Sequence, residues 1–149
     1  MASENVVSIV IPAEDVTAVQ DAIKVIEEKL KPHLVALQPA ERKELPKMSD
    51  KTAPFVEKVL DYAESDAEFA PAYLDVPELK KDLDAVGMLT LVARPIEQLS
   101  EMLNDTIMLA GSEAFVASLA YYNSVKQAAK MNVPGAKTIQ EDLAKRFDR

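Results

Sequence analysis

Apolar residues recur with a helical period from just after Pro12. Proline suits the first turn of a helix, because the backbone N–H that it lacks has no partner there. Spacings of three and four place one set on a single helix face: Val16, Val19, Ile23, Ile26 and Leu30. The pattern predicts a first helix that starts just after Pro12 and ends near Leu30, where Pro32 frays or kinks it.

The next apolar period follows a segment with two prolines. Gln38 to Pro46 is expected to form a single short turn. Ser49 is a suitable N-cap for the second helix, and Asp50 then stands in its first turn. The helix is expected to bury one face: Phe55, Val59, Tyr62 and Ala63. Ser65 to Val76 is the longest predicted loop.

A third helix is predicted to start at Asp75 or Val76, just before Pro77. It carries a long apolar stripe: Leu79, Leu83, Val86, Leu89, Val92, Ile96, Leu99, Leu103 and Ile107. Pro95 falls inside this stripe and removes the donor for the carbonyl of Leu91, so a bend is expected there.

Gly111 and Ser112 can close this helix and cap a fourth one. The fourth helix would present Phe115, Leu119, Tyr122, Val125 and Ala129. Residues 132–135 are expected to break it, and a last short helix is predicted at 138–147. Together these elements predict one all-α domain over 1–149, an antiparallel four-helix bundle with a kinked third helix and a short C-terminal helix.

Val6 to Ile11 is a β-branched run in an otherwise helical sequence. A single strand is not stable alone. Residues 1–11 are therefore expected to form an extended N-terminal arm. The arm could lie in a groove of its own bundle, or it could pair with the same segment of a second chain.

The amino-acid composition disfavours two classes of binding partner for this protein. The 149 residues carry a net charge of −8 and no cysteine. Such a charge disfavours nucleic acid, which needs basic surface, and anionic membranes. Acidic residues interrupt the longest stretch without Lys or Arg, from Pro95 to Val125, so no membrane span is expected. The absence of cysteine is compatible with the cytoplasm, where we expect the protein.

Two segments resemble a family of small uncharacterised bacterial helical-bundle proteins. The first runs from Leu37 to Thr52 and continues through Phe55–Val56–Glu57–Lys58. The second starts at Val133–Pro134–Gly135–Ala136–Lys137 and extends to Arg146–Phe147. Members of the family often have glycine where Ser49 stands here. The resemblance covers about a third of the chain and implies a bacterial protein, but no activity.

The residues do not indicate a known catalytic site. No nucleophile elbow, phosphate loop, dinucleotide-binding glycine pattern or zinc signature is present. A di-iron bundle needs two Glu-x-x-His motifs, but His33 is the only histidine, and Leu30 stands three residues before it. No cofactor is expected, and the sequence favours a protein that is not an enzyme. His33 continues the apolar stripe and is expected to be partly buried.

Glu97, Glu101 and Asp105 repeat every four residues and share a helix face. They are expected to face water, opposite the leucines of the same helix. A cation site or a contact with a basic partner is the alternative, although one helix alone gives an incomplete set of ligands.

Tyr62, Tyr121, Tyr122 and Asn123 bring polar groups near the predicted core. Buried hydroxyls need hydrogen-bond partners. They could form an ordinary hydrogen-bonded network, or they could line a small-ligand pocket between helices.

Apolar residues surround the segment from Pro95 to Val125 instead of following one face, and a helix of this kind is usually covered. Four of them are the candidate interface: Met102, Met108, Leu109 and Phe115. Either a second copy or the chain's own arm and last helix could cover them. The leading hypothesis is a non-enzymatic protein that acts by association as a homodimer. The alternative is a small-ligand carrier or enzyme with a pocket between helices.

Overall fold

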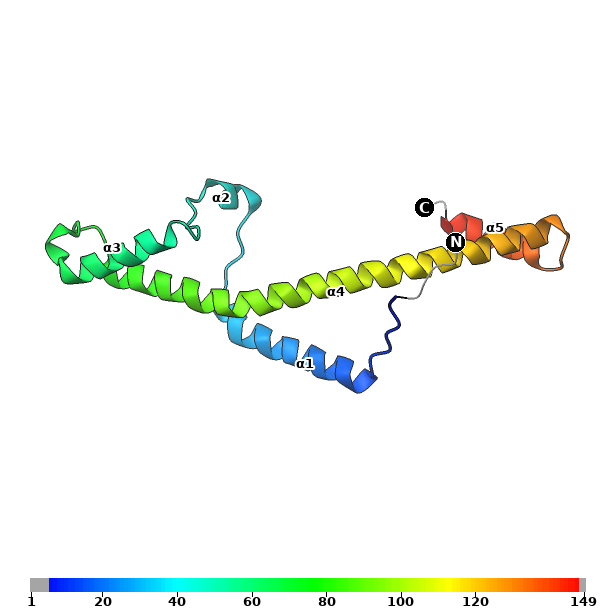
Figure 1. The fold of residues 1–149 in the computed structure, drawn as a ribbon, viewed down its shortest axis with the longest axis horizontal. Coiled ribbons are helices and arrows are strands. Elements are labelled where there is room, and N and C mark those ends of the chain that lie inside the picture. Colours follow the sequence, from blue (N-terminus) through cyan, green and yellow to red (C-terminus); the bar gives the residue numbers. More distant parts are fainter. Residues whose placement is uncertain (1–5, 148–149) are drawn as a thin grey trace. The chain divides into compact units, whose positions relative to one another are not determined.

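The computed structural model describes residues 6–147, and within this range it contains helices and no strand. The all-α prediction is therefore confirmed (Figure 1). The elements are α1 (Ala13–Leu30), η1 (Lys31–His33), α2 (Pro39–Glu44), α3 (Ala53–Ser65), η2 (Ala67–Phe69), α4 (Val76–Lys130) and α5 (Ala136–Phe147).

The chain divides into two units. We call Ile11–Ile96 the α1–α3 unit, and Met1–Val10 together with Glu97–Arg149 the α5 unit. The chain passes from one unit to the other after Val10 and again within α4, after Ile96. Residues 1–5 of the predicted arm lie outside the described residues.

α1 has the predicted limits. The carbonyl of Pro12 accepts hydrogen bonds from the backbone N–H groups of Asp15 and Val16, at 3.0 and 3.1 Å. Glu14 and Asp15 lie in the first turn, and Lys29 lies in the last turn. Acidic side chains at the start and a basic side chain at the end interact favourably with the helix dipole and stabilise the helix. The α-helix ends at Leu30, and the turn that contains Pro32 is a short 3-10 helix.

α2 is the short turn predicted between the two prolines. Its first turn is fixed by a capping box, in which the backbone N–H of Gln38 donates to Glu41 Oε1 at 3.2 Å. Pro39 stands at the first helical position, where its missing N–H has no cost.

The predicted cap of the next helix was wrong. Ser49 begins a separate turn, in which its carbonyl accepts the backbone N–H groups of Thr52 and Ala53 at 3.0 and 2.9 Å. α3 starts at Ala53, so Pro54 lies in its first turn. A helix capped at Ser49 would have placed Pro54 beyond the first turn, where its ring opposes the carbonyl of Asp50.

α4 joins the predicted third and fourth helices into one helix of 55 residues. Asp75 Oδ1 caps its start by accepting the backbone N–H of Glu78 at 3.1 Å. Gly111 does not end the helix, because its backbone keeps a negative φ and an interior glycine costs only about 1 kcal/mol relative to alanine. The helix is also continuous at Pro95. The expected kink and the antiparallel four-helix bundle are not confirmed.

The chain reverses direction between α4 and α5, at the break predicted for 132–135. Asn132 and Gly135 have φ of 58° and 86°, the only positive values in residues 6–147. The backbone N–H of Val133 donates back to Ala128 at 3.0 Å, which closes the end of α4. α5 then folds back beside α4, starting two residues before the expected Thr138 (Figure 1).

Little of the described chain is buried. The buried apolar residues are Leu60, Val125 and Ala136, with 8%, 8% and 7% of their surface exposed. The first lies on α3, and the other two lie in the α5 unit. Each unit therefore has very few fully buried side chains.

None of the helices within residues 6–147 is both long and apolar enough to cross a membrane.

Candidate association surfaces

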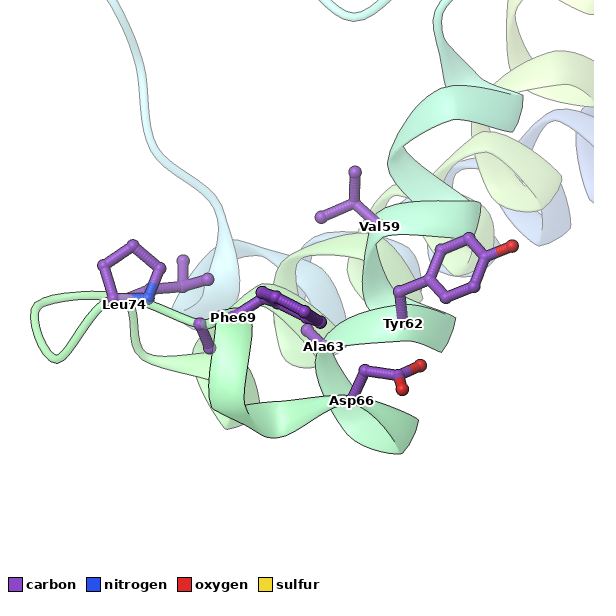
Figure 2. Close-up of a pocket in the computed structure, with 8 residues that line it drawn as sticks. Val59, Tyr62, Ala63, Asp66, Phe69 and Leu74 are labelled. Atoms are coloured by element: carbon purple, nitrogen blue, oxygen red, sulfur yellow. The ribbon is translucent and has the colours of Figure 1, made fainter.

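The α1–α3 unit contains an apolar hollow of about 460 Å³ at the end of α3 (Figure 2). α3, η2 and the segment that leads to α4 form its wall. We call this feature the α3 hollow, and its lining residues are Val59, Tyr62, Ala63, Asp66, Phe69, Ala70, Pro71 and Leu74.

The rings at the α3 hollow are accessible to solvent. Phe69 is 82% exposed, and Tyr62 is also exposed. Asp66 supplies the only formal charge of the lining, and its Oδ2 accepts a hydrogen bond from Ser65 Oγ at 2.8 Å. Lys58 Nζ lies 5.8 Å from the centre of the Tyr62 ring. Exposed aromatic rings beside a concave apolar wall are typical of protein-binding sites.

The α5 unit carries the four residues predicted as an interface. Met102 and Met108 are 62% and 72% exposed, and Leu109 and Phe115 are also exposed. All four lie on α4. The described residues of the α5 unit therefore leave this surface open.

The arm contacts α4 through one carboxylate. Glu113 Oε1 accepts the backbone N–H groups of Val6 and Val7, at 2.6 and 3.2 Å. A hollow of about 320 Å³ lies at this contact between the arm and α4, and its lining residues are Val7, Ile9, Ala110, Glu113, Ala114 and Ala117. Val10 is almost fully exposed. Val6, Val7 and Ile9 thus lie beside a helix of their own chain, and pairing with a second arm stays a prediction.

The structure does not gather the predicted ligand-pocket tyrosines in one unit. Tyr62 belongs to the α1–α3 unit, while Tyr121, Tyr122 and Asn123 belong to the α5 unit. Tyr122 is half-buried, with its ring centre 5.9 Å from that of Phe147 and 4.9 Å from Lys126 Nζ. Tyr121 and Asn123 are exposed. Tyr122 therefore holds α5 against α4, and its neighbours in sequence face solvent.

The acidic residues considered for a cation follow one another along α4. Glu97, Glu101 and Asp105 are all exposed. No three His, Cys, Asp or Glu side chains within residues 6–147 are placed to hold a metal ion. His33 lies in η1 and is exposed, so the prediction that it is partly buried was wrong for the single chain. Pro32 ends α1 before His33 can continue its apolar stripe.

Two features of these surfaces were not predicted. The α3 hollow depends on η2, a turn inside the segment expected to be a loop, and the aromatic residue Phe69 in that segment is the signal that could have indicated it. Glu113 gave no signal, because its hydrogen bonds join residues more than 100 positions apart.

Comparisons of the chain with protein-family models, with curated proteins and with solved structures give no match.

Proposed function

We propose that the chain is a non-enzymatic helical protein that acts by association with a second copy of itself. The main support for this proposal is that few side chains are buried among the residues that the structure describes. The exposed apolar side chains of α4 form the main contact surface in this proposal.

The exposed area supports an extensive interface. The chain exposes 13204 Å² for a mass of 16.4 kDa. A folded monomer of this mass exposes roughly 7,500 Å². Packing of the two units against each other would account for roughly 600–1,500 Å² of the excess of about 5,700 Å² per chain, and each chain of an obligate dimer buries roughly 1,000–2,500 Å².

The distribution of apolar residues favours α4 as the contact. Leu91, Leu99, Leu103 and Ile107 are exposed on it, together with Met102 and Met108. Burying apolar area stabilises an interface by roughly 25 cal/mol per Å² before the costs of association. A second copy presents the same helix, and twofold homodimers are the commonest soluble oligomers.

A charge on this surface tests the proposal. We expect Met102→Glu or Met108→Glu to separate the dimer, because a carboxylate buried between apolar side chains has no partner. Each unit has very few fully buried side chains, so helix content should fall as the dimer separates. Light scattering after size-exclusion chromatography measures the mass, and circular dichroism measures the helix content.

Gln20→Glu is the matched control, since it adds the same charge at an exposed polar position of α1, away from the α4 surface in the sequence. It should leave both the mass and the helix content unchanged. A wild-type chain that is monomeric and stably helical at micromolar concentration would contradict the proposal.

The α3 hollow supports a second proposal, a carrier of a small apolar ligand. Its volume of about 460 Å³ lies within the usual 300–1,000 Å³ of ligand pockets. Native mass spectrometry of gently purified protein tests this proposal. A bound mass that is present on the wild-type protein and absent from the Phe69→Asp variant would support the proposal. A wild-type protein without any bound mass in every preparation would contradict it.

A further inference from the structure

The α3 hollow lies in an acidic stretch of chain. Residues 59–79 contain six acidic and no basic residues: Asp61, Glu64, Asp66, Glu68, Asp75 and Glu78. Five of the six are exposed, and Asp66 is half-buried in the hollow itself. We call this acidic stretch the acidic rim. Asp66 lies in the hollow itself and Lys58 lies beside the Tyr62 ring, so acidic residues outnumber basic ones near the hollow and favour a basic occupant.

The α5 unit contains a stretch of sequence with the opposite charge, which ends at Glu141, one helical turn after Lys137. Residues 114–140 contain three lysines, Lys126, Lys130 and Lys137, and no acidic residue. Within residues 6–147, the ion pairs join Lys31 to Glu27, Lys81 to Glu78 and Arg146 to Asp142, so none involves these lysines. This stretch is unusual in a chain whose net charge is −8.

An apolar projection lies between two of these lysines, at the connection from α4 to α5. Met131 is 78% exposed, and Val133 is also exposed. The hydrogen bond from Val133 to Ala128 and the left-handed conformations of Asn132 and Gly135 fix the backbone here. We call residues 130–137 the α4–α5 knob. A fixed backbone loses little conformational entropy when it docks.

We propose that the α4–α5 knob of one copy docks in the α3 hollow of a second copy, and that the second copy docks its own knob in return. Met131 and Val133 would meet the apolar wall, while Lys130 and Lys137 would face the acidic rim. A twofold axis makes the two contacts equivalent. This proposal rests on the homodimer proposed above, and it adds two contacts to the one that the α4 surfaces form.

A charge exchange tests this pairing. One variant carries Lys130→Glu and Lys137→Glu, and another carries Glu64→Lys and Glu68→Lys. Each variant alone places like charges at both contacts, so its dimer should dissociate at least about tenfold more readily than wild type. A mixture of the two should form a heterodimer of nearly wild-type affinity, because one contact is exchanged and the other is native.

The matched control is a variant in which two exposed lysines of α1 are reversed in charge, Lys24→Glu with Lys29→Glu. When this control is mixed with the variant that carries Glu64→Lys and Glu68→Lys, it should not form heterodimers in preference to homodimers. Sedimentation velocity measures each dissociation constant. Circular dichroism at high protein concentration shows whether each variant still folds.

Cross-linking gives an independent readout, since the chain has no cysteine of its own. Met131→Cys and Ala70→Cys place single thiols on the knob and in the hollow. Mixed in equal amounts and oxidised gently, they should form the mixed disulfide in preference to either symmetric one, because a disulfide needs Cα atoms about 4.4–6.8 Å apart. Val133→Cys replaces Met131→Cys if the latter fails to fold.

The outcomes separate the two proposals. A wild-type dimer that gives only symmetric disulfides, and no recovery of affinity on mixing, overturns the docking of knob in hollow but leaves the homodimer. A doubly substituted chain, Met131→Cys with Ala70→Cys, that closes its disulfide only within one chain also overturns it. A wild-type monomer overturns both proposals.

Discussion

The carboxylate of Glu113 joins two segments that are far apart in the sequence. It accepts two backbone N–H groups from the arm, and these two hydrogen bonds connect residues 6–10 to α4. Hydrogen bonds to a charged acceptor contribute roughly 1.5–3 kcal/mol each, less when solvent reaches them, as it does at Val6. One side chain therefore fixes where the arm begins to follow the helix.

We expect Glu113→Ala to release the arm. Hydrogen exchange at the backbone amide of Val7 should become about tenfold faster, which corresponds to a loss of ~1.4 kcal/mol. Hydrogen exchange followed by mass spectrometry measures this change. Glu101→Ala, an equivalent substitution on the same helix, is the control and should leave the exchange rate unchanged. Equal rates in both variants would mean that the carboxylate does not hold the arm.

Among the secondary-structure elements, those with strong local signals were predictable. Pro12 and Leu30 bound α1 as predicted, because a proline, an apolar period and a second proline all act within a few residues. The helix end predicted at Gly111 was wrong. Glycine ends a helix in this way only when its φ is positive, and the residue type alone does not determine the sign of φ. The cap predicted at Ser49 was wrong for a similar reason, because Thr52 and Pro54 together set a later start.

Two glycines of the α5 unit should respond to alanine in opposite directions. Gly111 lies inside α4, and the neighbouring side chains within residues 6–147 leave open space for an added methyl group, so Gly111→Ala should stabilise the protein by about 0.5–1 kcal/mol. Gly135 has a φ of 86°, so Gly135→Ala should destabilise it by about 1–2 kcal/mol despite similar open space. Urea unfolding at one protein concentration measures both free energies. A loss of stability in Gly111→Ala would indicate that the helix is interrupted there.

For the protein as a whole, the sequence indicated apolar side chains that their own unit leaves exposed, and whether a second copy covers them stays a prediction. Met102, Met108, Leu109 and Phe115 were identified because they surround the helix, and all four are exposed. The residues predicted to share one ligand pocket are divided between the units, since Tyr62 and Tyr122 belong to different ones. Apolar periodicity shows which side chains need cover, but the covering element depends on tertiary and quaternary contacts that the period does not encode.

The thermal midpoint should depend on protein concentration, because folding and association are coupled in the homodimer that we propose. A tenfold increase in concentration adds about 1.4 kcal/mol per mole of dimer, which raises the midpoint by a few degrees. Differential scanning calorimetry over a hundredfold range of concentration, on the order of 1 to 100 µM, measures the shift. A midpoint that stays constant over this range would indicate a chain that folds alone.

The small number of buried side chains also has a consequence for how long a newly synthesised chain persists in the cell. In the homodimer that we propose, a newly made chain would be exposed to proteases and to aggregation until it meets a second copy. The rate of dimer formation would then depend on the square of the chain's abundance, so a modest fall in synthesis would remove a larger share of the assembled protein. Expression level itself would thereby set whether the protein is present in usable form.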